Sequence, residues 1–340
     1  MSSEATVLTE IRGRAGLITL NRPQSMNALT HEMVTLIAEA LEQWRNDENV
    51  DLVIIRGAGD RAFCAGGDVV GLYHDALAQG SAGVAFWEEE YALNLAISQY
   101  PKPYVAIMKG YVLGGGVGVS AHGSHRIVTD STRIGMPETG IGFIPDVGGS
   151  HLLANSPDNL GVHLSLTGAH VGAAEALHTG FADFYVPEAD LEELVDKLTA
   201  TGDGSLIAGA DPGEPFDGNV TAMSTAYAGE SVEEILANLD ALEDAWAAQA
   251  AKRIRRNSPT AVKVALESLR RAQGQTLSQA LETELRVSVN SQQSPDFIEG
   301  VRAQLVDKDR NPQWLPATLA EVTAEHIEAA FAPISQTARV

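Results

Sequence analysis

Short apolar runs alternate with amphipathic segments over the first part of the chain. Val7–Arg12 and Leu17–Leu20 are β-like runs on either side of a short glycine-containing segment, a pattern typical of a hairpin. Apolar residues then recur at helical spacing from Met33 to Trp44, and Thr30 precedes them as a candidate N-cap. The pattern therefore predicts a β-hairpin followed by an amphipathic helix.

Two further apolar runs have the length of buried strands. Leu52–Ile55 precedes a Gly-Ala-Gly-Asp turn, and Tyr104–Met108 follows a Pro-Lys-Pro segment. Strands that alternate with helices in this way favour an α/β fold over a sandwich or a helical bundle.

Helix start signals accumulate in the last third of the chain. Two segments fit the capping box, and two Ser-Pro pairs place a cap before a proline at the first helical position. They begin at Ser231, Thr276, Ser258 and Ser294. Residues 201–227, in contrast, are rich in Gly, Asp, Ser and Pro. The sequence therefore predicts three parts: a core over 1–200, a surface excursion or linker over 201–230, and a helical region over 231–340.

Composition and charge narrow the class of protein. The 340 residues carry a formal net charge of −22, which repels phosphate backbones, so we expect no nucleic-acid partner. No run reaches the roughly 18 apolar residues of a membrane span, and the start of the chain lacks the pattern of a targeting segment. The single cysteine, Cys64, excludes a disulfide framework and suits a reducing compartment. We expect a soluble cytoplasmic protein with no membrane partner.

Two glycine-rich turns carry the first candidate chemistry. Residues 62–68 contain Gly66 and Gly67 just after a predicted strand, and residues 110–118 contain five more glycines after another strand. A tight strand-to-helix turn is the plainer interpretation of the first segment. In the second, the spacing fits a dinucleotide fingerprint poorly, and no Gly-Lys-Ser/Thr follows to make a P-loop. Two such turns suit a pair of converging backbone donors, as in the oxyanion hole for a thioester or enolate oxygen.

A third segment places two acids among apolar residues, glycines and prolines. Glu138 and Asp146 lie eight positions apart in it. Isolated acids are often ion-paired or cap a helix. An apolar setting favours the catalytic alternative, because desolvation brings carboxyl pKa values toward those needed for acid/base chemistry.

With these segments in view, the chain resembles the crotonase (enoyl-CoA hydratase/isomerase) superfamily, over roughly residues 7–316. Within it the resemblance is closest to the 3-hydroxyisobutyryl-CoA hydrolases. The segments that carry the resemblance are Leu20-Asn21-Arg22-Pro23, Asn27-Ala28-Leu29, Phe63–Asp68, Glu89-Glu90-Tyr91, Lys102–Ala106, Gly114–Gly116, Met136–Thr139, Phe143–Gly149, Gly300–Ala303 and Asp307–Pro312.

The resemblance implies a fold, a ligand and site residues. The fold would be a spiral of β-β-α units with a helical C-terminal region, and the assembly a homo-oligomer, a trimer or hexamer. The amides of Gly67 and Gly115 would hold the thioester oxygen. Three acids, Glu90, Glu138 and Asp146, match positions that line the acyl pocket. The residues at positions that meet the CoA part of the substrate are Ala62, Ala65, Gly66 and Asp68.

Departures from the hydratase pattern favour hydrolysis. Hydratases carry a second catalytic Glu where this chain has Gly118, and usually a Gly where it has Asp146. A separate departure concerns CoA binding and not the reaction. Gln24 stands where many members of the superfamily have a Lys, so one contact to the phosphate or adenosine of CoA that the resemblance implies is in doubt.

The expected activity is hydrolysis of a short branched 3-hydroxyacyl-CoA, as in valine breakdown. Glu138 would be nucleophile or general base, and Asp146 would orient the substrate hydroxyl and water. No metal or other cofactor is expected, since coenzyme A is part of the substrate. The alternatives are an enoyl-CoA hydratase/isomerase and a non-catalytic acyl-CoA binding protein.

Overall fold

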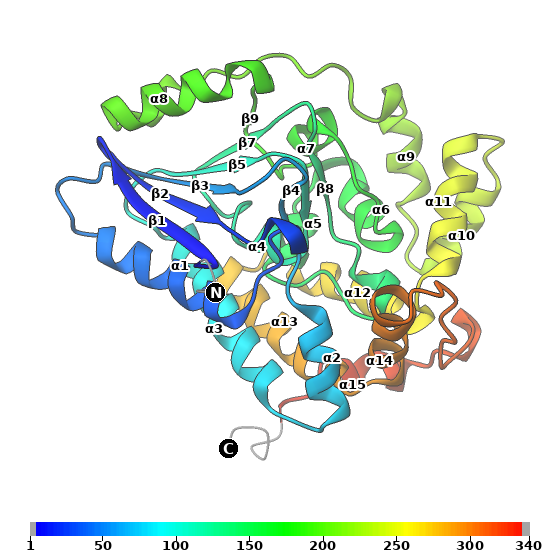
Figure 1. The fold of residues 1–340 in the computed structure, drawn as a ribbon. Coiled ribbons are helices and arrows are strands. Elements are labelled where there is room, and N and C mark those ends of the chain that lie inside the picture. Colours follow the sequence, from blue (N-terminus) through cyan, green and yellow to red (C-terminus); the bar gives the residue numbers. More distant parts are fainter. Residues whose placement is uncertain (1–4, 335–340) are drawn as a thin grey trace. The chain divides into compact units, whose positions relative to one another are not determined.

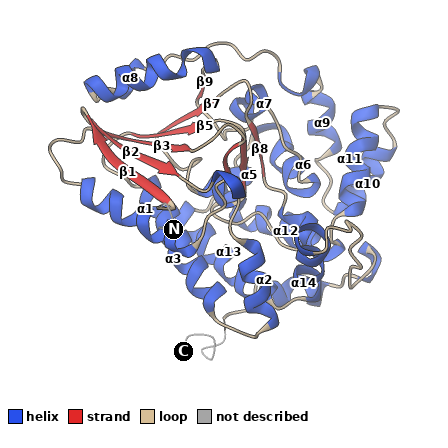
Figure 2. Cartoon of the chain, in the orientation of Figure 1, coloured by secondary structure: helices blue, strands red, loops and turns tan. Residues whose placement is uncertain are grey.

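The computed structural model describes residues 5–334, which form two β-sheets and many helices (Figure 2). The strands are β1 (Val7–Arg12), β2 (Ala15–Leu20), β3 (Leu52–Gly57), β4 (Ala62–Ala65), β5 (Tyr104–Met108), β6 (Tyr111–Leu113), β7 (His125–Val128), β8 (Arg133–Gly135) and β9 (Phe184–Tyr185). The first eight helices are α1 (His31–Trp44), α2 (Val69–Leu77), α3 (Ala82–Ser98), α4 (Gly115–Gly118), α5 (Gly149–Ala154), α6 (Leu160–Thr167), α7 (Ala173–His178) and α8 (Leu191–Thr201). They are followed by α9 (Val220–Ala226), α10 (Val232–Asp240), α11 (Ala245–Arg256), α12 (Pro259–Ala272), α13 (Leu277–Gln292), α14 (Pro295–Val301) and α15 (Ala324–Ala330).

The strands follow a spiral that alternates between the two sheets. The larger sheet has the order β1-β2-β3-β5-β7-β9, and the smaller has the order β4-β6-β8. Among the strands of the described residues, β1 and β2 pair antiparallel and the other strand pairs are parallel. The pairs β3/β4, β5/β6 and β7/β8 each give one strand to each sheet. This confirms the expected α/β spiral of repeated units.

The local predictions for the first part of the chain are confirmed. The hairpin pairs Val7 with Leu20 and Arg12 with Ala15. Thr30 caps α1 by accepting a hydrogen bond from the amide of Met33. The two predicted buried strands are β3 and β5, of which β3 extends two residues further than expected.

Both faces of the larger sheet are covered by helices, as Figure 1 shows for α8 and α1. On one face, apolar residues of α8 such as Leu194 and Leu198 pack with Leu17 and Ile54 of the sheet. On the other face, the ring of Trp44 lies so close to Gly16 that any Cβ there would meet it at 2.4 Å. The sheet therefore needs a glycine at that position for α1 to pack closely.

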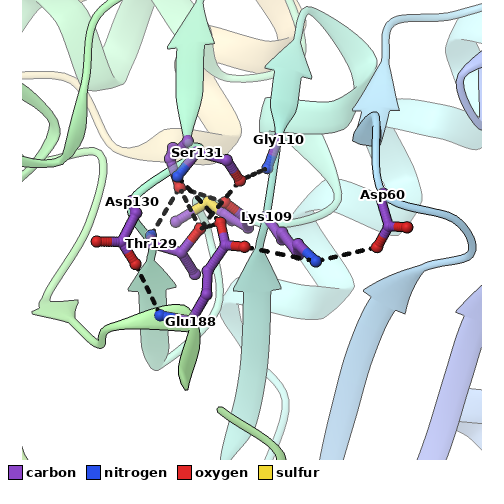
Figure 3. Close-up of polar contacts among 9 residues, drawn as sticks. Asp60, Lys109, Gly110, Thr129, Asp130, Ser131 and Glu188 are labelled. Atoms are coloured by element: carbon purple, nitrogen blue, oxygen red, sulfur yellow. Dashed lines mark hydrogen bonds and ion pairs between the residues drawn. The ribbon is translucent and has the colours of Figure 1, made fainter. Parts of the chain in front are cut away.

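A polar network holds the turn that leads from β5 into β6 (Figure 3). Lys109 bridges Asp60, at 3.1 Å, and Glu188, at 3.5 Å. Glu188 also accepts hydrogen bonds from the Thr129 hydroxyl and the Ser131 amide, each at 3.0 Å. Because Asp60 is exposed and each partner is satisfied within the network, we assign it a structural role.

The chain divides into two compact units, each built from three separate segments. The first is residues 1–67, 92–135 and 171–217, and the second is residues 68–91, 136–170 and 218–340. The predicted division into 1–200, 201–230 and 231–340 differs from this, because the chain crosses between the units several times. Residues 201–230 also include α9, which belongs to the second unit.

The C-terminal helices begin where the capping signals place them. Ser258 and Ser294 cap α12 and α14, each with proline at the start of the helix. Thr276 and Gln279 form the expected reciprocal box on α13. Ser231 caps α10, but the Glu234 carboxylate turns to the amide of Glu230 instead of completing a box. No helix within residues 5–334 is both long enough and apolar enough to cross a membrane.

Candidate active site

The two glycine turns of the first unit leave adjacent strands at the same level. Ala65 ends β4 and Leu113 ends β6, and these two residues are register partners in a parallel pair. Gly67 and Gly115 each lie two residues beyond those partners. Gly115 is the first residue of α4, where amides lack partners within the helix. The arrangement fits a pair of backbone donors, which is the role the sequence predicts.

Close packing between the two turns explains the glycines around them. A Cβ on Gly116 would lie 2.3 Å from the carbonyl oxygen of Cys64, so a larger residue cannot fit there without displacing backbone. Gly66 and Gly114 have φ values of +108° and +47°, which favour glycine. Cys64 is buried and its thiol donates to the carbonyl of Gly66, so it is part of the turn's packing.

The predicted CoA contacts fall on the same stretch of chain. Ala62 and Ala65 bound β4, and Gly66 follows it. Asp68 is the N-cap of α2, where its carboxylate accepts a hydrogen bond from the amide of Gly71 at 3.3 Å. Asp68 therefore has a structural role, and the contacts of all four residues with CoA stay predictions.

Three carboxyl groups predicted from the sequence come together inside the second unit. Glu90 lies on α3, Glu138 is the first residue of a 3-10 helix, and Asp146 precedes α5. They are 2%, 7% and 6% exposed, so all three are buried. The three groups are close enough to act on one another: the charge of Asp146 raises the pKa of both glutamates, and the charge of Glu90 raises the pKa of Glu138.

Burial raises the pKa of each of these carboxyl groups. Desolvation is the largest cause for Glu90 and for Glu138, and the negative charge of Asp146 raises the pKa of both further. Desolvation also raises the pKa of Asp146, against the opposing effect of a hydrogen bond from Tyr91. Carboxyl groups whose pKa is raised toward neutrality are suited to donating and accepting protons, and burial shifts all three acids in that direction, Asp146 to a pKa of about 7.

Two carboxyl oxygens in the cluster are left without a hydrogen-bond partner among the described residues. They are Oε1 of Glu90 and Oε2 of Glu138, and both are buried. Buried polar atoms are normally paired, and unpaired ones are typical of sites that bind a ligand or water. These two oxygens therefore have hydrogen-bonding capacity that no described residue uses.

Helix α13 contributes residues that the sequence analysis missed. The hydroxyl of Tyr91 donates to Oδ2 of Asp146 at 2.6 Å and lies 2.7 Å from the hydroxyl of Ser288. Glu284 accepts from the amides of Gly148 and Ser150 at 2.6 and 2.9 Å, and from the Ser150 hydroxyl. Burial raises the pKa of Glu284 to about 8, although these hydrogen bonds oppose the shift.

One signal in the sequence points to these residues. Glu284 and Ser288 lie on the apolar face of α13, among Ala280, Leu281 and Val287. A charged residue on the buried stripe of an amphipathic helix needs partners inside the protein. The pattern alone does not say that the partners belong to the segment carrying Asp146.

Comparison with known proteins identifies the family. The model of the enoyl-CoA hydratase/isomerase family matches residues 15–331, and the chain belongs to this family. A mitochondrial 3-hydroxyisobutyryl-CoA hydrolase of Danio rerio is 38% identical over 99% of this chain and 92% of that protein. The Homo sapiens protein of the same name is 38% identical over 96% of this chain and 88% of its own.

Solved structures extend the comparison. A carnitinyl-CoA dehydratase from Mycobacterium thermoresistibile has a TM-score of 0.94 and 48% identity, covering 98% of both chains. An enoyl-CoA hydratase from Rhodobacter sphaeroides 2.4.1 has a TM-score of 0.93 and 43% identity, covering 97% of this chain and 98% of its own. The family and the crotonase fold are thus confirmed, while the names of these relatives cover both hydrolysis and addition or loss of water.

Proposed function

We propose that this protein hydrolyses a short branched 3-hydroxyacyl-CoA thioester, 3-hydroxyisobutyryl-CoA in valine breakdown, to the free acid and CoA. The observation that supports this proposal most directly is the cluster of three buried carboxyl groups, two of whose oxygens have no hydrogen-bond partner among residues 5–334. The curated relatives named as hydrolases of this thioester, matched along nearly the whole chain, support the choice of substrate.

The reaction uses backbone donors and one carboxylate. The amides of Gly67 and Gly115 stabilise the oxyanion that forms when the thioester carbonyl is attacked. Glu138 is either the nucleophile or the general base. As nucleophile it forms an acyl anhydride while the C–S bond breaks and CoA leaves as thiolate, and water then cleaves the anhydride. As base it accepts a proton from the water that attacks the carbonyl.

The other two acids act on the acyl group and on protons. Asp146 accepts a hydrogen bond from the substrate hydroxyl and orients the attacking water. Glu90 lines the acyl pocket, and its raised pKa suits an acid that supplies the proton taken up by the leaving thiolate. The CoA part of the substrate lies along Ala62, Ala65, Gly66 and Asp68. The reaction as written needs no metal or redox cofactor.

A second candidate is addition of water to an enoyl-CoA, or its removal from a hydroxyacyl-CoA. The names of the two solved structures described above favour it, and two acids in one buried site are what such chemistry needs. The absence of a carboxylate at Gly118 argues against it. A non-catalytic acyl-CoA binding protein is the remaining alternative, and it predicts binding without turnover.

One experiment separates these possibilities. Purified protein is mixed with short acyl-CoAs, with and without a 3-hydroxyl group, and release of thiol and loss of enoyl absorbance are followed in parallel. Thiol release from 3-hydroxyisobutyryl-CoA supports hydrolysis. Loss of enoyl absorbance without thiol release supports hydration, and calorimetric binding with neither signal supports a binding protein.

Assembly and location belong to the same proposal. We propose a homo-oligomer, a trimer or hexamer as in the superfamily, which light scattering coupled to size-exclusion chromatography tests. We also propose a cytoplasmic location, which the single cysteine, buried as a thiol, supports. Fractionation of the source cells followed by immunodetection checks the location.

A further inference from the structure

The segment that carries Asp146 has a costly backbone conformation. Val147, a β-branched residue, has φ +53°, and Gly148 after it has φ +79°. A β-branched residue in the left-handed region is rare, and such a conformation persists only where the surrounding structure holds it. Asp146 therefore depends on other contacts to keep this turn in place.

Glu284 supplies contacts of this kind. Its two carboxylate oxygens accept from the amides of Gly148 and Ser150, on either side of Gly149, and from the hydroxyl of Ser150. Glu284 is 1% exposed, so its hydrogen bonds do not compete with water. A buried side chain that accepts three hydrogen bonds from one short segment, two of them from backbone amides, holds that segment in place, and losing any of them leaves a buried donor unpaired.

Ser288 acts on the same acid from one helical turn further along α13. Residues four apart on a helix lie on one face, about 6 Å apart along the axis. The Ser288 hydroxyl contacts the Tyr91 hydroxyl, which in turn donates to the Asp146 carboxylate. One face of α13 thus acts on Asp146 in two ways: Glu284 binds the backbone that follows Asp146, and Ser288 contacts the tyrosine that donates to its side chain.

We propose that Glu284 and Ser288, with Tyr91, are positioning residues that hold Asp146 in the orientation in which it recognises the substrate hydroxyl. Glu284 holds the turn after Asp146, and Ser288 fixes Tyr91 on the carboxylate. The inference rests on the proposed function, because the hydroxyl of a 3-hydroxyacyl-CoA is the group that Asp146 recognises there.

Glu284→Gln is the main test variant. Glutamine keeps the volume but places an NH2 group against a backbone or hydroxyl donor, so at least one hydrogen bond is lost. The matched control is Asp296→Asn on α14. Asp296 is also buried and accepts from a serine hydroxyl, that of Ser258, and from a backbone amide, that of Leu315. Within residues 5–334 the charge that acts on its carboxyl group is that of Glu299, not that of an active-site acid.

The decisive readout is discrimination between substrates. The ratio of kcat/KM for 3-hydroxyisobutyryl-CoA to that for isobutyryl-CoA is measured in wild type and in each variant. A small misplacement of a reacting group costs up to ~10²-fold. We expect Glu284→Gln to lower the ratio at least tenfold, mainly through the hydroxylated substrate. Asp296→Asn should lower the thermal midpoint and leave the ratio unchanged.

Two further variants keep the test decisive if Glu284→Gln does not fold. Ser288→Ala and Tyr91→Phe each remove one hydroxyl and little volume, and each should lower the same ratio, Tyr91→Phe more strongly. An unchanged ratio in these variants, or in folded Glu284→Gln, would overturn the proposal. If wild type adds water to enoyl-CoA and releases no thiol, the proposed function fails. In that case the positioning proposal fails as well, since no hydroxyl-dependent hydrolysis remains for it to explain. If wild type does release thiol but the variants leave the ratio unchanged, the positioning proposal fails alone and the proposed function stands.

Discussion

Ala65 and Leu113 are register partners at the ends of two parallel strands, so the amides of Gly67 and Gly115 emerge at one level of the smaller sheet. Parallel pairing determines this, because the carboxyl ends of parallel strands share one edge. The helix α4 begins at Gly115 and adds the partial positive charge of its N-terminus. The pair is suited to stabilise negative charge on an oxygen.

Gly115→Pro tests this pair directly. Proline lacks the amide donor, yet it is tolerated at the first position of a helix, where Gly115 lies. We expect turnover to fall by ~10²–10³-fold, as for the loss of one oxyanion donor. Circular dichroism and the thermal midpoint control for folding. A folded variant with unaltered turnover would show that this amide does not act in the reaction.

Glu138→Gln tests the proposed role of Glu138 as the reacting carboxylate. The change keeps the volume and removes the charge needed by a nucleophile or a base. We expect kcat to fall by at least ~10²–10⁴-fold, with the Kd for a CoA ester largely kept, as measured by calorimetry. Full activity in this variant would instead favour chemistry that does not pass through Glu138.

Asp146→Asn tests recognition of the hydroxyl. Asparagine still accepts the hydrogen bond from Tyr91 but loses the charge. We expect a larger loss of kcat/KM for 3-hydroxyisobutyryl-CoA than for isobutyryl-CoA, because a site built to bind a hydroxyl discriminates strongly against analogues without it. An equal loss on both substrates would assign Asp146 to water or to structure.

Gly118 leads to a prediction about the rival chemistry. The chain lacks a carboxylate at this position. We therefore expect the turnover number for hydration of crotonyl-CoA to be far below the ~10 s⁻¹ typical of enzymes. The measurement is the loss of enoyl absorbance. Turnover at or above that rate would contradict the assignment as a hydrolase.

The raised carboxyl pKa values predict how stability depends on pH. Glu284 has a pKa of about 8 in the folded protein against an ordinary 4.5, so between these values the folded state binds a proton that the unfolded state has lost. Stability from this group is present below pH 4.5 and is lost as the pH rises toward 8, by up to ~1.4 kcal/mol per pH unit. Glu90 and Glu138 shift in the same direction.

The measurement is the thermal midpoint of wild type and Glu90→Gln between pH 5 and pH 8. The wild-type midpoint should fall over this range, and the fall should be smaller in Glu90→Gln, which carries one fewer buried acid. Glu193→Gln is the control, because Glu193 forms an exposed ion pair with Lys197. An identical fall in wild type and Glu90→Gln would contradict the prediction.

The local elements of this protein were determined by the sequence itself. Alternation and helical spacing predicted the hairpin β1/β2, helix α1 and strands β3 and β5, because these periodicities reflect which side of an element is buried. The caps at Thr276, Ser258 and Ser294 followed because their partners lie within three residues. Motif order likewise indicated the family and its three candidate acids.

Tertiary structure decided the rest. It brought Glu284 and Ser288 to the segment of Asp146 across more than 130 residues. It also left one oxygen each of Glu138 and Glu90 without a hydrogen-bond partner in the part of the chain that the structure describes. It also divided the chain into two units of three segments each. The strength of each acid follows from desolvation and from neighbouring charge, and both depend on residues that are distant in the sequence and become neighbours only through folding.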